Sequence, residues 1–135
     1  MSAFEFRVSA IMIKLVATLG ALAAVTGCSA ADSSSAGQAA QKFITAVADG
    51  GTSACALLAP RARDGLGAAG CGPGSPVDQV PRGEVTATVV WGDEAQARSA
   101  ADTLFLHEFP DGWRVTGAGC RPRNEQVYDC LVGGR

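Results

Sequence analysis

The 135-residue chain is poor in the residue types that most often carry chemistry or fill a core. It has one histidine, one tyrosine and two tryptophans, whereas alanine (25) and glycine (17) make up almost a third of it. Because an alanine-rich core buries little apolar surface per residue, such a small domain is expected to need cross-links. The length excludes a TIM barrel and a two-domain enzyme, and it leaves room for one domain.

The chain also lacks an excess of positive charge. Eleven basic residues stand against 13 acidic ones, which gives a formal net charge of -2. A domain that binds nucleic acid carries a basic face that neutralises phosphates. Nucleic acid is therefore not expected as a partner.

No hydrophobic run has the length of a transmembrane helix, but the N-terminus carries a shorter one. Residues 11–25 are mostly apolar with Lys14 as their one charge, and they fall short of the roughly 20 residues that a spanning helix needs. Together with Arg7 and Lys14 as a positive start, this pattern predicts a signal peptide over residues 1–27. Met12 is an equally good start, because Met12-Ile13-Lys14 alone supplies a short positive region.

The predicted cleavage site ends in a cysteine. Val25-Thr26-Gly27-Cys28 places small residues before Cys28 and resembles the lipobox of bacterial lipoproteins. The resemblance implies that Cys28 takes a diacylglyceryl thioether, becomes the mature N-terminus and anchors the chain to the outer face of the cell membrane. The alternative is an ordinary secreted protein with Cys28 near the cut. Residues 28–35, small and polar, are then a flexible tether, and residues 36–135 form the domain.

Four cysteines remain once Cys28 is assigned to lipid, and an even number outside the cytosol predicts disulfides. Of the three possible connectivities, we expect Cys55–Cys71 and Cys120–Cys130, because each pair closes a short loop rich in Gly, Pro and Arg. Zinc is not expected, because there is no Cys-x-x-Cys pair and His107 lies thirteen residues from the nearest cysteine. Neither a metal nor a cofactor is predicted.

Hydrophobic spacing predicts a helix at the start of the domain. Ser35 and Gln38 form a capping-box pattern, and apolar residues then recur at three-four spacing until Gly50-Gly51 ends the helix. Short helical pieces are expected over residues 52–58 and 60–63.

Alternating patterns then predict three or four antiparallel strands. Residues 84–91 read as a strand with Val85, Ala87, Val89 and Trp91 on one face. Residues 95–101 read as a weak strand, and residues 102–109 and 113–118 as two strands joined by a turn at 110–112.

This order predicts an α+β fold, with an N-terminal helix packed on a curved antiparallel sheet of three to four strands. The element order and Asp111-Gly112-Trp113-Arg114-Val115 resemble the NTF2-like/cystatin-like group. More narrowly, the lipobox, the run 54–60, the run 112–120 and Tyr128-Asp129-Cys130 resemble small lipoproteins of actinobacterial type. These resemblances imply a fold and a location but no reaction.

Two kinds of site are considered within that fold. An apolar cavity lined by Phe43, Val89, Phe105 and Trp113 would hold a small apolar ligand. His107, as the only histidine, is the best candidate for a general base, and the nearby carboxylates are Asp102, Glu108 and Asp111. Strand parity, however, puts His107 and Asp102 on opposite faces.

One glycine motif is set aside. Residues 65–70 match G-x-G-x-x-G, but they run into Cys71-Gly72-Pro73, which cannot open the helix that a dinucleotide site needs. With no catalytic residues assigned, we expect a membrane-anchored, non-enzymatic binding or accessory module, whose partner is a protein or a small ligand. The alternatives are a carrier or sensor of a small apolar ligand, and a small isomerase or hydrolase that uses His107.

Overall fold

The computed structural model describes residues 27–50 and 52–134, with side chains from residue 32 onward. Residues 1–26 of the predicted signal peptide and the side chain of Cys28 lie outside the described part, so the lipid anchor stays a prediction. Among the helices that are described, none is long and apolar enough to cross a bilayer.

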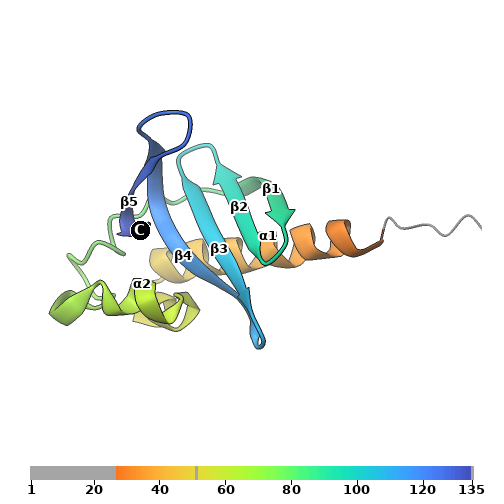
Figure 1. The fold of residues 1–135 in the computed structure, drawn as a ribbon. Helices are drawn as coiled ribbons and strands as arrows, with labels where there is room; N and C mark the ends of the chain where they lie inside the picture. Colours follow the sequence, from red (N-terminus) through yellow and green to blue (C-terminus); the bar gives the residue numbers. More distant parts are fainter. Residues whose placement is uncertain (1–26, 51, 135) are drawn as a thin grey trace, which may run out of the picture.

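Helical segments precede a single antiparallel sheet (Figure 1). The helical segments are α1 (Gly27–Ala48), the 3-10 helix η1 (Thr52–Leu57), α2 (Pro60–Asp64) and the 3-10 helix η2 (Gly67–Ala69). The strands are β1 (Val85–Trp91), β2 (Glu94–Ser99), β3 (Thr103–Phe109), β4 (Gly112–Pro122) and β5 (Tyr128–Gly133), and they pair in that order. The α+β class and the meander are confirmed. The sheet has five strands rather than three or four, because Tyr128–Gly133, which includes the end of the Cys120–Cys130 loop, pairs with β4.

α1 begins at Gly27, eight residues before the predicted start at Ser35, so the predicted tether is helical. Ser35 does not cap the helix; its hydroxyl donates to the carbonyl of Asp32 one turn earlier. Gln38 donates to the hydroxyl of Ser34 and not to a backbone group at the helix start. Residues 29–35 contain no glycine or proline, so nothing in them stops the helix.

The core lies between α1 and one face of the sheet. Buried residues recur along one face of α1: Ala36, Ala40, Phe43, Ile44, Ala46 and Val47. They meet Ala95 and Ala97 of β2 and the larger Leu104 and Leu106 of β3. Small residues on both sides let the helix approach the sheet closely, which leaves Phe43 fully buried within packed side chains.

The prediction that all four apolar residues Val85, Ala87, Val89 and Trp91 share one face of β1 is wrong, because Val85 packs on the core. Val89 and Trp91 are 59% and 51% exposed, whereas Thr88 and Val90 face α1. The pairing of β1 with β2 shifts between Val85 and Ala87, which marks a bulge. One extra residue in a strand sends every later side chain to the opposite face, so the sequence pattern after the bulge points away from the core.

Both predicted disulfides are present. Cys55–Cys71 joins η1 to the long segment before β1, with a Cα–Cα distance of 5.7 Å. Cys120–Cys130 joins paired residues of β4 and β5, with a Cα–Cα distance of 3.9 Å. The loop-closing choice among the three connectivities is therefore confirmed.

Candidate functional site

The face of the sheet opposite α1, which we call the outer face, carries most of the reactive side chains. Residues that lie directly opposite on neighbouring strands share a face, so the register places them in rows. The first row runs through Trp91, Glu94, His107 and Arg114. The second row, toward the other end of the strands, is Val89, Gln96 and Phe105. Aromatic, apolar and charged groups therefore alternate across one open surface.

His107 lies between two carboxylates. Its Nδ1 is 2.6 Å from Oε1 of Glu94, the residue directly opposite on β2. Its Nε2 is 3.8 Å from Oδ2 of Asp93. The Phe109 ring packs edge-on against the imidazole, with centroids 4.8 Å apart. The three polar side chains form a compact group, hereafter the His107 cluster, whose nitrogen and oxygen ligand atoms lie within 4.8 Å of one another.

Local backbone geometry brings Asp93 to this cluster. Gly92 and Asp93 form the two-residue turn between β1 and β2, and Gly92 adopts a φ of 65°, which glycine tolerates without strain. The carbonyl of Asp93 accepts the backbone N–H of Glu108 at 2.8 Å. This bond ties the turn to β3, so the Asp93 side chain lies next to His107.

The carboxylates predicted as partners of His107 are engaged elsewhere. Asp102 is buried and accepts backbone N–H groups from Thr103, Gly119 and Cys120, at 2.7, 3.0 and 2.8 Å. Burial raises the pKa of Asp102 above its usual value, although these three bonds oppose the rise. Asp102 therefore holds the start of β3 to residues 119–120 of β4 and takes no part in the His107 cluster.

Asp111 is occupied as well. It forms an ion pair with Nη2 of Arg114, and this hydrogen bond lowers the pKa of the Asp111 carboxyl. Nη1 of the same guanidinium donates to the carbonyl of Ala56 at 2.8 Å. Glu108, the third predicted partner, is neighbour to His107 in β3 and by alternation points to the other face. Sequence reasoning missed Glu94 and Asp93; the turn between β2 and β3, which sets the register that pairs Glu94 with His107, is the signal that could have found Glu94.

The other end of the outer face is aromatic. The Phe105 and Tyr128 rings meet edge to face with centroids 5.0 Å apart, and Gln96 donates to the Tyr128 hydroxyl at 3.2 Å. They border a shallow hollow of about 380 Å³ beside Val127 and the Cys120–Cys130 disulfide. A methyl group on Gly117 would lie 3.4 Å from each sulfur atom, so glycine keeps this floor open.

The predicted ligand cavity is not formed. Phe43 is buried between α1 and the sheet, whereas Val89 and Phe105 belong to the outer face. Trp113 packs against the core from β4. Since the sheet itself separates Phe43 from Val89 and Phe105, the four side chains cannot line one cavity. The bulge in β1 and the alanine-filled helix–sheet contact explain the difference.

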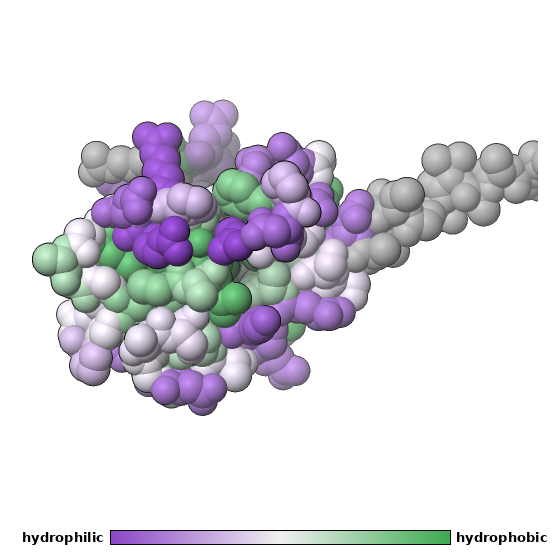
Figure 2. Space-filling model, turned by 90° about the horizontal axis from the view of Figure 1, so that it is seen from below, coloured by the Kyte–Doolittle hydropathy of each residue, from purple (hydrophilic) through white to green (hydrophobic). Residues whose placement is uncertain are grey.

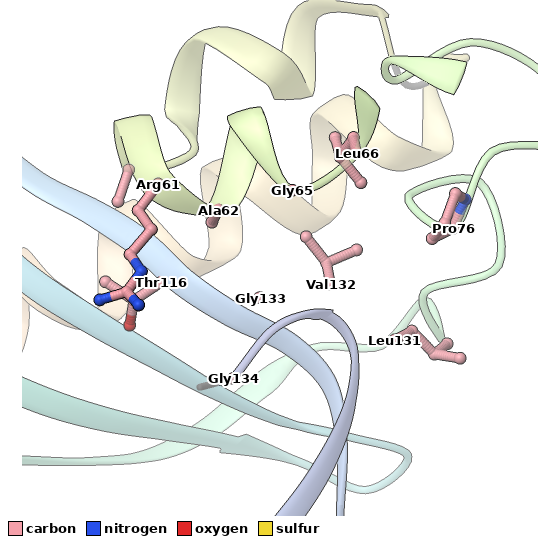
Figure 3. Close-up of a pocket in the computed structure, with 11 residues that line it drawn as sticks. Arg61, Ala62, Gly65, Leu66, Pro76, Thr116, Leu131, Val132, Gly133 and Gly134 are labelled. Atoms are coloured by element: carbon pink, nitrogen blue, oxygen red, sulfur yellow. The ribbon is translucent and has the colours of Figure 1, made fainter. Parts of the chain in front are cut away.

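A different hollow lies between α2 and β5 (Figure 3). Its volume is about 450 Å³, and its walls are mostly apolar, with Ala62 and Leu66 on one side and Leu131 and Val132 on the other. Arg61 supplies a positive charge. On the face seen from below, hydrophobic residues form a band between hydrophilic ones (Figure 2). We refer to the hollow as the α2–β5 cleft.

Comparison of the chain with protein-family models, with curated proteins and with solved structures finds no match.

Proposed function

We propose that the chain is an extracytoplasmic lipoprotein, anchored through Cys28 to the outer face of the cell membrane. The lipobox-like Val25-Thr26-Gly27-Cys28 behind an apolar run supports the anchor. The two disulfides support export, because thiols stay reduced in the cytosol. The resemblance to NTF2-like proteins belongs to this proposal, and α1 lying across an antiparallel meander is consistent with it.

The domain acts in this proposal as a non-enzymatic module that binds a partner protein through the outer face. The observation that carries this step is the exposure of Val89 and Trp91 beside the polar side chains of Glu94 and His107. An exposed aromatic surrounded by polar groups is typical of protein interfaces, whereas small ligands prefer deep concave sites. The His107–Glu94 pair is open to water, which weakens the case for a general base.

Two measurements test this function. Metabolic labelling with an alkyne-tagged palmitate should mark the protein and should fail for Cys28→Ala; an equally labelled variant refutes the anchor. For the outer face, a photo-reactive amino acid at position 89 should give one discrete cross-linked product in intact cells, and Trp91→Arg should abolish it. The same label at the exposed Thr45 of α1 is the control. Equal products from both positions would refute a specific outer-face interface.

The α2–β5 cleft favours a second candidate, a carrier or sensor of a small apolar ligand. Apolar walls with one cationic group suit a ligand that has an apolar body and an acidic end. Native mass spectrometry of the protein purified from its membrane should then retain a co-purifying small molecule. Leu131→Trp fills the cleft from an exposed position and should remove it, whereas Val127→Trp, outside the cleft, should not.

A further inference from the structure

We propose that Asp93 and His107 form a binding site for a divalent late transition metal ion such as Zn²⁺, with Glu94 orienting the imidazole. The site goes beyond the proposed binding function and does not depend on it. The sequence argues against a zinc site with cysteine ligands, because it has no Cys-x-x-Cys pair. The site proposed here has carboxylate and histidine ligands instead.

The contact between Glu94 and Nδ1 of His107 decides which nitrogen can bind metal. An ionised carboxylate only accepts hydrogen bonds, so at 2.6 Å the proton lies on Nδ1. The lone pair that a metal can use then lies on Nε2, on the side of Asp93. Metal-binding histidines commonly donate their second ring N–H to a carboxylate, which fixes the tautomer and raises the basicity of the ligand nitrogen. Glu94 occupies that position.

The distance between Nε2 and Asp93 provides a second, separate observation. At 3.8 Å, Nε2 and Oδ2 are too far apart for a hydrogen bond. Two ligands of one tetrahedral Zn²⁺ ion, each about 2.1 Å from the metal, stand about 3.4 Å apart. Asp93 is 69% exposed in a turn, so its side chain can close the remaining gap. Water completes the coordination.

The ligand types select the class of metal. An imidazole nitrogen paired with a carboxylate oxygen suits Zn²⁺ and Cu²⁺, whereas Mg²⁺ and Ca²⁺ prefer oxygen alone. The competing explanation is a protonated imidazole held between two carboxylates. In that arrangement Nε2 carries a proton, whereas in the proposed site Nε2 binds the metal. The state of Nε2 therefore distinguishes the two explanations.

The chain offers a clean measurement because His107 is its only histidine. The full chain, without a histidine tag and in detergent micelles, is labelled with ¹⁵N on the imidazole and titrated with Zn²⁺ at neutral pH. We expect saturable 1:1 binding that shifts the Nε2 resonance and leaves Nδ1 protonated, and no response to Mg²⁺. A protonated Nε2 that does not respond to Zn²⁺ overturns the site, as does binding through Nδ1.

Three variants complete the test. Asp93→Asn, at an exposed turn that leaves the fold intact, should abolish saturable binding. Glu94→Gln should weaken it by about 10–100-fold, the usual effect of removing an orienting carboxylate. Glu108→Gln removes a neighbouring negative charge on the other face and should change neither affinity nor the Nε2 shift. Binding that survives Asp93→Asn, or that is weakened equally by Glu108→Gln, refutes the proposed ligands.

Discussion

The carboxylate of Asp102 accepts the backbone N–H of Cys120 at 2.8 Å, eighteen residues along the chain. The second oxygen accepts the N–H of Gly119, which has a φ of 64° at an irregular part of the β3–β4 pairing. A bulge leaves backbone groups without a strand partner, and here one buried carboxylate satisfies two of them. Asp102 is thus a structural residue that stabilises the pairing of β3 with β4.

Asp102→Asn should lower the free energy of unfolding by about 1–3 kcal/mol at neutral pH. The amide has one acceptor oxygen in place of two, so a buried N–H of Gly119 or Cys120 loses its partner. Urea unfolding measures the change. Asp129→Asn, which removes an exposed ion pair with Arg123, is the control and should cost well under this amount. Equal stability of the two variants would contradict the structural role of Asp102.

The same variant should also change the pH dependence of stability. Burial raises the pKa of Asp102 above 3.8 in the folded state. A carboxyl whose pKa is higher in the folded state than in the unfolded state adds to the free energy of unfolding. This contribution is complete at pH values below the unfolded-state pKa and is lost as the pH rises through the folded-state pKa. The wild type should therefore exceed Asp102→Asn in stability by more at about pH 3 than at about pH 7. A difference that grows with pH would show that the hydrogen bonds outweigh the burial.

The two disulfides should contribute comparable stability. In the chain-entropy description, closing loops of 16 and 10 residues contributes about 3 kcal/mol each, with the longer loop slightly ahead. Serine replacement of both cysteines in either pair, followed by thermal unfolding, measures each contribution. If the Cys55–Cys71 pair can be removed without loss, the long segment before β1 is held by its other contacts alone.

Trp113 carries a buried indole N–H that has no hydrogen-bond partner among the described residues. Trp113→Phe removes this group and keeps an aromatic ring, so the free energy of unfolding should change by less than about 1.5 kcal/mol. Trp113→Ala should cost about 3–5 kcal/mol, because it also empties the space that the ring fills. Chemical unfolding monitored by circular dichroism separates the two. Equal losses would mean that the indole nitrogen has a partner, such as a bound water.

Features set by residues close together in the sequence are predicted correctly, whereas features set by strand pairing are not. The disulfides and the buried face of α1 follow from local spacing, since the cysteines close short loops and the apolar residues recur at helical intervals. The outward orientation of Val89 does not, because the bulge after Val85 turns the following side chains to the face opposite the one that strict alternation from Val85 predicts. The reversal removes Val89 from the predicted ligand cavity, and the alternation of β3 places Phe105 on the same outer face, away from Phe43.

The His107 cluster shows the same limit at the candidate site. Sequence proximity suggested Asp102 and Asp111 as partners of His107. Asp111, however, is paired with Arg114, and Asp102 is buried where the start of β3 pairs with β4. The actual neighbour, Glu94, is thirteen residues away and reaches His107 only through the register of β2 and β3. Register depends on turns and bulges that the hydrophobic pattern does not encode.

The contact between α1 and β1 leaves no room for a side chain at Gly37. A methyl group there would lie 2.8 Å from the hydroxyl oxygen of Thr88, which is closer than side chains approach. Gly37→Ala should therefore destabilise the fold, although alanine is favoured over glycine in an exposed helix by about 0.5–1 kcal/mol. Thr88→Ala removes the obstructing oxygen, so the double variant Gly37→Ala/Thr88→Ala should recover stability relative to Gly37→Ala. A double-mutant cycle from urea unfolding gives the coupling energy. A coupling of zero would mean that α1 and β1 do not meet at these two residues.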